Sequence, residues 1–197
     1  MKAYLFRTFF WVIGLFGLAL PIQVAYAQNQ VVDNGVSYLK TAQSPDGSWG
    51  NDADLTVLDT STVLDTFKLL NISDGAYSNG VVWLGSQSSS STDFLSRKII
   101  SLSLAGVDVS ADVTTLINSK NPDGGWGEDA NFSSSPFDTA LALQALKATT
   151  PSDPAIANAA LAYLLATQNP DGGFGFYAGD DSNLYMTALV SATILTR

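Results

Sequence analysis

Apolar residues recur at intervals of three and four along most of the chain beyond residue 28, which is the spacing of amphipathic helices. The positions that form these stripes are Val32, Val36, Leu39, Tyr77, Val81, Leu84, Leu95, Ile99, Leu102, Val109, Val113, Leu116, Ile117, Ile156, Ala160, Leu161, Leu164 and Leu165. The pattern predicts an all-α fold.

A Gly-rich block separates neighbouring helical stretches and occurs three times, at residues 44–50, 121–127 and 169–175. Each block reads Ser or Asn, Pro, Asp, Gly, Ser or Gly, an aromatic residue, Gly, and a second helical stretch with a Thr near its start follows it. The repeat positions are Pro45, Asp46, Gly47, Trp49, Pro122, Asp123, Gly124, Trp126, Pro170, Asp171, Gly172 and Phe174, with Gln43 and Gln168 before two of the blocks. The repeating unit is therefore predicted to be helix, turn, loop, helix.

The block is typical of a tight turn at the end of a helix. Proline disfavours the helical conformation in the residue before it, and Pro-Asp-Gly favours a turn in which Gly takes a positive φ. The aromatic ring is then expected to pack over the end of the hairpin, where its burial contributes about 1.5–3 kcal/mol. An aromatic-lined ligand site is the alternative, but a feature repeated in every unit favours packing.

Four hairpins are predicted, at residues 28–71, 73–106, 107–149 and 152–197. The second lacks the Gly-rich block and instead has a polar loop at residues 88–91, with Trp83-Leu84 at the place of the aromatic-Leu pair of its neighbours. Helix starts are indicated at Ser135-Pro136, Asp153-Pro154, Ser182-Asn183 and Thr92-Asp93, where a capping side chain precedes the helix. Hairpins stacked side by side bury a face that none could bury alone.

The spacing from Tyr38-Leu39 through Gln43 and Gly47 to Trp49 resembles the QW motif of squalene and oxidosqualene cyclases. The block at residues 163–174 resembles it with Phe in place of Trp, and the block at residues 120–127 lacks the Gln. Most of residues 29–197 is thus similar to the prenyltransferase and squalene-cyclase repeat superfamily. That resemblance implies an α/α toroid, which usually has six hairpins in two concentric rings. With four hairpins, this chain is expected to form a partial, open toroid.

The chemistry known in that superfamily is mostly excluded by composition, because the chain contains no His and no Cys. The zinc site of prenyltransferases and the thioester of complement domains need those residues. Squalene-hopene cyclases protonate an alkene with Asp-x-Asp-Asp, and the nearest match, at residues 135–140, keeps only Asp138. Asp138 is a weak catalytic candidate, because an acid at this position is also expected at a helix start.

The net charge of -9 argues against nucleic acid as a partner. A pair of acidic residues follows each block, and these residues are Asp52, Asp54, Glu128, Asp129, Asp180 and Asp181. Calcium needs about six to eight oxygen ligands, and two carboxylates per loop fall short of that. Paired carboxylates could also serve a glycosidase, but no acid–base pair is fixed by the spacing. We expect solvated loop charges, no metal and no cofactor.

The first 27 residues have the three parts of a secretory signal peptide. Lys2 and Arg7 precede the uncharged residues 8–27, which end in Ala25-Tyr26-Ala27. The apolar heart of twelve residues, 9–20, is shorter than the roughly 20 residues that span a bilayer, so an uncleaved anchor is the less favoured alternative. We expect cleavage after Ala27, export to the periplasm or the extracellular space, no membrane span in the mature form, and one repeat domain at residues 28–197.

Taken together, these patterns favour an exported, non-catalytic module that binds or scaffolds a protein or an apolar small molecule. The last helix, near residues 186–195, is apolar and lacks a polar cap, which suggests self-association through the C-terminal hairpin or a fragment of a longer protein. A relative of class II terpene cyclases is the first alternative. A carbohydrate-active α/α toroid is the second.

Overall fold

The computed structural model describes residues 30–52, 55–149 and 153–195. The predicted signal peptide and Asp54 lie outside these residues. The chain divides into two units, Met1–Gln43 and Ser44–Arg197, and each is described by itself. Within the described residues every regular element is a helix, and the one pairing of the β type is the isolated bridge between Trp126 and Ser135. The predicted all-α fold is confirmed.

In the first unit, residues 30–41 form a helix. Most of its residues are exposed, including the apolar side chains of Val31, Val32 and Tyr38. Glycine in a helix interior costs about 1 kcal/mol relative to Ala, and Gly35 stands in the middle of this helix.

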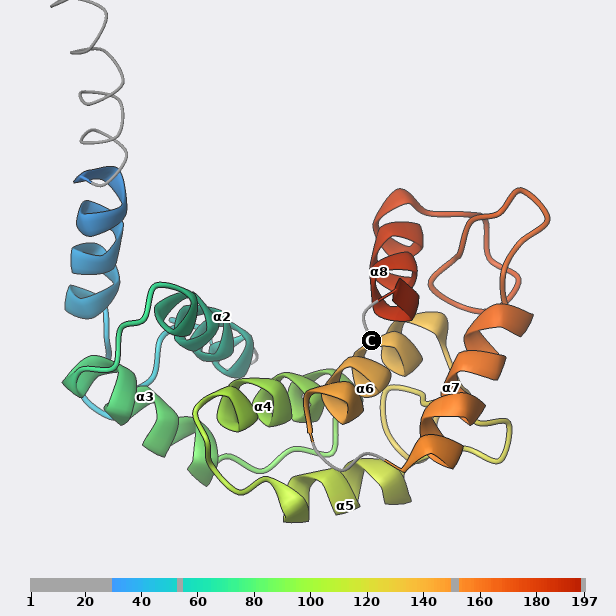
Figure 1. The fold of residues 1–197 in the computed structure, drawn as a ribbon, viewed down its shortest axis with the longest axis horizontal. Coiled ribbons are helices and arrows are strands. Elements are labelled where there is room, and N and C mark those ends of the chain that lie inside the picture. The colour runs from blue at the N-terminus through green and yellow to red at the C-terminus, as the bar shows by residue number, and fades with distance from the viewer. Residues whose placement is uncertain (1–29, 53–54, 150–152, 196–197) are drawn as a thin grey trace, which may run out of the picture. The chain divides into compact units, whose positions relative to one another are not determined.

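The second unit contains the remaining helices of the described residues, shown in Figure 1. Their bounds are α2 Thr56–Leu69, α3 Gly75–Ser86, α4 Thr92–Leu104, α5 Ser110–Asn118, α6 Pro136–Ala148, α7 Pro154–Ala166 and α8 Leu184–Leu195. These bounds confirm the predicted helix pairs at residues 73–106, 107–149 and 152–197. The first predicted hairpin, at residues 28–71, spans both units and stays a prediction.

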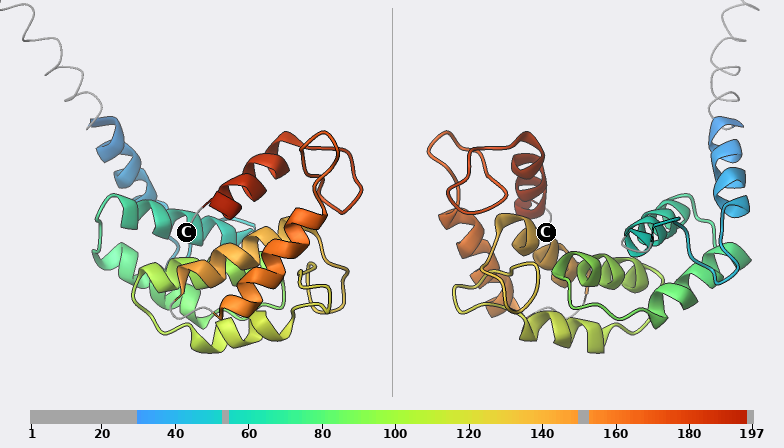
Figure 2. Two further views of the ribbon diagram at one scale, coloured as in Figure 1. Left: turned by 45° about the vertical axis from the view of Figure 1, so that its right-hand side comes forward. Right: turned by 180° about the vertical axis from the view of Figure 1, so that it is seen from behind.

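The helices of the second unit form two layers. The even-numbered helices pack against one another in the order α2, α4, α6, α8, and both views of Figure 2 show this row. The odd-numbered helices pack on the row from one side, with α3 on α2 and α4, α5 on α4 and α6, and α7 on α6. Chain order therefore alternates between the layers.

Burial follows position in the row. Helix α6 lies between α4 and α8 and beneath α7, and nine of its 13 residues are buried. Helix α8, the last in the row, buries Met186, Val190 and Thr193 and exposes Leu184 and Leu195. A helix in the middle of the row is thus mostly buried, whereas the helix at its end buries three of its 12 residues.

Two of the predicted helix starts are confirmed in detail. The Ser135 hydroxyl accepts from the Asp138 amide at 3.0 Å, and the Asp153 carboxylate accepts from the Ala155 amide at 2.8 Å. Helix α4 begins at Thr92 as predicted, but the capping role of Thr92 was wrong: Ser91 is the residue before α4, and the Thr92 hydroxyl donates to the Gly127 carbonyl at 2.7 Å. This bond satisfies a buried carbonyl of the second Gly-rich block, which competes with capping for the hydroxyl.

The start of α8 is capped by Asn183 rather than by Ser182. The Asn183 side chain accepts from the Met186 amide at 3.2 Å, while the Ser182 hydroxyl donates to Asp171. No helix in the described part of the chain is both long and apolar enough to cross a membrane.

Candidate functional site

The three Gly-rich blocks fold into the same turn. In each, the amide of the central Gly donates to the carbonyl of the residue three positions earlier, at 2.9–3.0 Å. These glycines are Gly47, Gly124 and Gly172, with φ of 97°, 95° and 87°. A positive φ is strained for any residue with a Cβ, so the predicted role of these glycines is confirmed.

A threonine from the second helix of the hairpin holds each turn. The backbone amide of Trp126 donates to the Thr139 hydroxyl at 2.9 Å, and that hydroxyl donates back to the Trp126 carbonyl at 3.4 Å. Thr60 makes the same pair with Trp49, and Thr187 accepts from the Phe174 amide at 3.0 Å. The hydroxyl thus satisfies buried backbone groups that the turn cannot pair internally.

The turn aspartate also has a hydroxyl partner in every copy. Asp123 accepts from the Gly125 amide at 3.0 Å and from the Ser134 hydroxyl at 2.7 Å. Asp171 has the equivalent pair, with Ser182 as the hydroxyl donor at 2.7 Å. In the first copy the hydroxyl comes from within the turn, because Ser48 donates to Asp46 through both its amide, at 3.0 Å, and its side chain, at 2.7 Å.

The source of this hydroxyl is explained by space. A Cβ on Gly125 would lie 2.7 Å from the Cβ of Ser134, so a side chain at 125 and the loop serine cannot both fit. A Cβ on Gly173 would likewise collide with Ser182. In the first copy Ser48 of the turn itself supplies the hydroxyl that bonds the turn aspartate. In the second and third copies a serine of the following loop supplies it, so the same hydroxyl comes from two different positions in the sequence.

Amide side chains close the second and third loops. Asn121 donates to the Phe132 carbonyl at 2.9 Å and to the Ser134 hydroxyl at 3.0 Å. Asn169 donates to the Asp180 carbonyl at 2.8 Å and to Ser182. Of the two glutamines that precede a block, Gln168 donates to the Gly172 carbonyl at 2.9 Å, which ties the motif residue to the turn it precedes.

The aromatic rings of the blocks are buried: Trp49 is 3% exposed, Trp126 0% and Phe174 2%. The Trp126 indole donates to the Leu116 carbonyl at 2.7 Å, at the end of α5 where carbonyls lack helical partners. Trp49 meets Phe67 edge to face, with ring centroids 5.8 Å apart. These rings therefore lie within the packing between helices.

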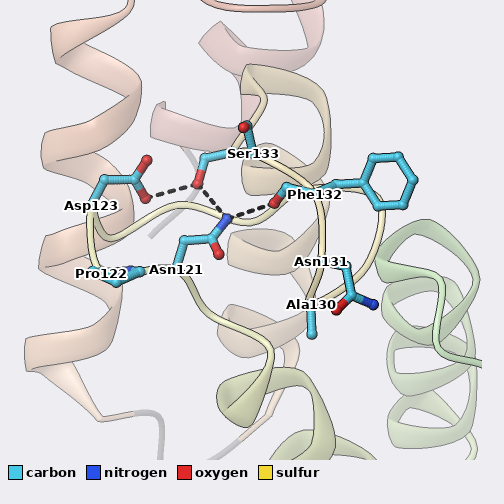
Figure 3. Close-up of a pocket in the computed structure, with 8 residues that line it drawn as sticks. Asn121, Pro122, Asp123, Ala130, Asn131, Phe132 and Ser133 are labelled. Carbon is cyan, nitrogen blue, oxygen red and sulfur yellow. Dashed lines mark hydrogen bonds between the residues drawn. The ribbon is translucent and has the colours of Figure 1, made fainter.

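A hollow of polar character lies between the second turn and its loop (Figure 3). It has a volume of about 420 Å³ and is lined by Asn121, Pro122, Asp123, Ala130, Asn131, Phe132, Ser133 and Ser134. Phe132 is 52% exposed at its rim. The dashed bonds in Figure 3 join Asp123, Ser134, Asn121 and the Phe132 carbonyl, so most polar groups of the hollow are engaged with one another.

Asp138 lies at the start of α6 and is 7% exposed. The Ser135 hydroxyl donates to its carboxylate at 2.7 Å. Burial raises the pKa of Asp138 above its usual value, the Ser135 hydrogen bond opposes this, and the negative charges of Asp93 and Glu128 raise the pKa further. A carboxyl in this setting keeps its proton to a higher pH than a free aspartate does.

The acidic residues after the blocks do not assemble into a ligand cluster. Glu128, Asp52, Asp180 and Asp181 are exposed, and Asp129 is half-buried. Asp129 accepts from the Asn131 amide at 2.7 Å, and Asp180 accepts from the Tyr177 amide at 3.1 Å. Among the described residues, no three His, Cys, Asp or Glu side chains come together as metal ligands would.

Sequence reasoning missed the residues that hold the turns together. The threonines were noted only for their place in the second helix, Ser182 was noted only as a helix start, and Ser48 and Ser134 were not singled out. The signal was present in the spacing: 13 residues separate the aromatic from the Thr in the second and third copies, and 11 separate the Asp from the Ser. A fixed distance between two polar types across a variable loop predicts a bond between them.

No family model matches the sequence, and a search of curated proteins finds no relative. The resemblance to the QW-motif superfamily therefore stays a prediction from residues 38–49 and 163–174.

Proposed function

We propose that the protein is an exported helical-hairpin module that binds or scaffolds a partner and catalyses no reaction. In this proposal the hairpins form a partial α/α toroid, with α2, α4, α6 and α8 as the inner layer and α3, α5 and α7 as the outer layer. The alternation of layers along the chain supports the toroid. Export rests on the signal-peptide pattern of residues 1–27.

The observation that carries the proposal is that the polar groups of the repeats are used to build the repeats. The Asp, Asn and Ser of the second turn bond to one another and to backbone amides, and the third turn copies this arrangement. A catalytic group is instead expected to point into a cavity with a base, acid or nucleophile in reach of substrate. The repeated, mutually bonded arrangement favours a structural role.

A partner for such a module is either a protein or an apolar small molecule. The net charge of -9 disfavours nucleic acid and anionic surfaces. Apolar side chains that stand exposed at the end of the inner row, including Leu184 and Leu195, favour contact with another apolar face.

A relative of class II terpene cyclases is the second candidate, and Asp138 is the observation that favours it. Its raised pKa suits a proton donor. Against this, its carboxylate already accepts from Ser135 at the helix start, and the remaining acids of the Asp-x-Asp-Asp motif are missing from residues 135–138.

A carbohydrate-active module is the third candidate, favoured by the polar hollow with Phe132 at its rim. An exposed aromatic ring on the loop that lines a polar hollow suits a sugar ring. A soluble-glycan array with the parent protein and Phe132→Ala tests this candidate: glycan binding that Phe132→Ala abolishes would support it over the scaffold.

The catalytic alternative is tested by incubating the purified protein with squalene and analysing extracted products by gas chromatography with mass spectrometry. The proposal predicts no cyclised product above a protein-free blank for the parent or for Asp138→Asn. Product that the parent makes and Asp138→Asn does not would overturn it. Asp108→Asn, a change at another helix start, is the matched control for nonspecific loss.

A further inference from the structure

The first and second turns are each covered by the first helix of a following hairpin. A Cβ on Gly47 would lie 2.6 Å from the carbonyl oxygen of Asn79 in α3, and a Cβ on Gly124 would lie 2.8 Å from that of Ala159 in α7. Gly47 and Gly124 are accordingly buried. The contact is backbone against backbone, so it requires small residues on both sides.

The covering helix also places an aromatic residue on the turn beneath it. The bonds from Ser48 lower the pKa of Asp46, and the nearby Trp83 side chain contributes to this in smaller measure. The Tyr163 hydroxyl donates to the Ser134 carbonyl at 2.7 Å. Each aromatic directly precedes a buried leucine, Leu84 or Leu164. Turn and covering helix thus form one interface that the structure contains twice.

The third turn has no such cover in the described residues. Nothing lies within 4 Å of a Cβ on Gly172, and Gly172 is exposed. Ser182 is exposed, whereas the equivalent Ser134 is buried. Leu184, three positions before Thr187, is 92% exposed, whereas Pro136, three positions before Thr139, is buried. The interface found at the first two turns is half-formed at the third.

The helix at residues 30–41 carries the matching half. It ends in an aromatic-Leu pair, Tyr38-Leu39, as the two covering helices do. In that register Asn34-Gly35 falls on Asn79-Gly80 of α3, the same two residue types. Gly80 is buried, and a Cβ added there would lie 2.5 Å from the Trp49 ring. Gly35 is exposed, and a Cβ added there would have nothing within 4 Å. Tyr38 is 71% exposed.

We infer that the protein assembles head to tail: the helix at residues 30–41 of one copy covers the third turn of a second copy. Asn34-Gly35 lies against the Gly172 turn, and the Tyr38 hydroxyl donates to the Ser182 carbonyl as Tyr163 does to that of Ser134. Such an interface joins two different faces, so it continues into a ring if the rotation closes and into a chain of copies if it does not.

Repulsion between two copies is weaker at this position than at most faces. Helices α7 and α8 contain no charged residue, and the helix at residues 30–41 contains Asp33 and Lys40, whose charges cancel. The third turn and its loop carry the exposed Asp171, Asp180 and Asp181, so in a chain of net charge -9 a neutral helix is repelled there less than an acidic face would be. Leu184 on one side and Val31 on the other, 71% exposed, supply apolar area.

This inference rests on the proposed function for the hairpin repeat alone and is independent of whether the protein has a catalytic activity. If the protein self-associates and also converts squalene, the proposed non-catalytic function is wrong and the head-to-tail assembly is retained. If it is a monomer and does not convert squalene, the assembly is wrong and the proposed function is retained.

The test uses two blocked variants and their mixture. Gly35→Arg blocks the covering helix, Leu184→Arg blocks the third turn, and Val82→Arg, at an exposed site on α3, is the matched control. The full chain, in the form that the expressing cells produce, is analysed by size exclusion with light scattering over a series of concentrations. Circular dichroism checks that each variant retains the helical content of the parent.

Head-to-tail assembly predicts that the parent and Val82→Arg grow in mass with concentration and that each blocked variant is a monomer. Mixing the two blocked variants restores one interface, because one retains the intact helix and the other the intact turn, and gives a species of two chains. Tyr38→Phe is expected to weaken association between about two- and tenfold, the effect of one hydrogen bond.

Three results would overturn the inference: a parent that stays monomeric, association that survives Gly35→Arg, or a mixture that stays monomeric. A symmetric contact between the α8 helices of two copies would survive Gly35→Arg and would be lost only in Leu184→Arg, so it would give the second of these results. A blocked variant that lost helical content would be replaced by Gly35→Lys or Leu184→Glu, which block the same faces.

Discussion

The backbone amide of Trp126 donates to the hydroxyl of Thr139 at 2.9 Å, and the two residues stand 13 positions apart across a loop. Both residues are fully buried. The bond fastens the turn that ends one layer of helices to the first turn of α6 in the other layer. Its repetition at Thr60 and Thr187 makes it the common element of all three Gly-rich blocks.

Thr139→Val is expected to lower the free energy of unfolding by about 1–3 kcal/mol, because the buried amide of Trp126 loses its acceptor. Thr139→Ser keeps the hydroxyl and should recover most of this loss. Thr114→Val, at an exposed site on α5, should change the free energy by less than about 0.5 kcal/mol. Urea unfolding measures all three, and equal losses for Val and Ser would contradict the role of the hydroxyl.

A second prediction concerns moving the hydroxyl that bonds Asp123 from Ser134 of the loop to position 125 of the turn. Gly125→Ser should destabilise the protein by about 1–3 kcal/mol, because its Cβ would lie 2.7 Å from that of Ser134. Adding Ser134→Gly removes this collision, and once the Thr139 hydroxyl, 2.8 Å from the new Cβ, has shifted slightly, the new hydroxyl can bond Asp123 as Ser48 bonds Asp46.

The double variant is therefore expected to be more stable than the sum of the two single changes predicts. A double-mutant cycle in urea measures this coupling. Strict additivity would show that the two hydroxyl sources are not interchangeable. The same exchange at Gly173 and Ser182 serves as an independent repeat.

Much of this fold could be predicted from the sequence because its signals are local. The apolar period gives the helices, and Pro-Asp-Gly gives the turn with Gly47, Gly124 and Gly172 at positive φ. Ser135 and Asp153 were predictable as caps for the same reason. Thr92 was not, because its hydroxyl bonds Gly127, 35 residues away, and the local pattern does not contain that partner.

The candidate site was less predictable because its bonds cross loops. Asp123 and Asp171 were singled out from the repeat, but their serine partners lie 11 residues later and carry no local signal. The acidic pairs after the blocks looked like a cluster in sequence, but the described ones are exposed or bonded to nearby amides. Which faces are covered depends on how hairpins stack, and periodicity does not encode that.

The pH dependence of stability should change with Asp138. Burial, the largest effect, and the charges of Asp93 and Glu128 raise its pKa in the folded protein above the ordinary value of an aspartate. Between that value and the raised pKa the folded state holds a proton that the unfolded state releases. The contribution of Asp138 is therefore most favourable at low pH and declines as the pH rises through the raised pKa.

Asp138→Asn removes this dependence, so its stability relative to the parent should increase as the pH rises from about 4 to 7. Asp108→Asn should show the opposite trend, and at lower pH: hydrogen bonds from the Ser110 amide and hydroxyl lower the pKa of Asp108, so its contribution is present above about pH 4 and is lost as the pH falls. Urea midpoints at several pH values measure both. Parallel pH profiles for the two variants would contradict the assigned environments.

Two buried serines on α4 give opposite predictions for the same substitution. The Ser96 hydroxyl is 0% exposed and has no hydrogen-bond partner among the described residues, so Ser96→Ala should raise the free energy of unfolding by about 1 kcal/mol. The Ser101 hydroxyl donates to Asp65 at 2.7 Å, so Ser101→Ala should lower it by about 1–2 kcal/mol. Thermal unfolding distinguishes the two, and a loss at Ser96 would reveal a partner for its hydroxyl.

The central claim is that the three turns are equivalent units. Helices α3 and α7 cover the first two, and the helix at residues 30–41 of a second copy covers the third. Amide hydrogen exchange by NMR at Trp49, Trp126 and Phe174 tests it most directly, because each amide bonds the threonine of its own unit. In dilute protein the Phe174 amide should exchange faster than those of Trp49 and Trp126, and raising the concentration should slow Phe174 selectively. Equal protection of the three amides at every concentration would contradict the account.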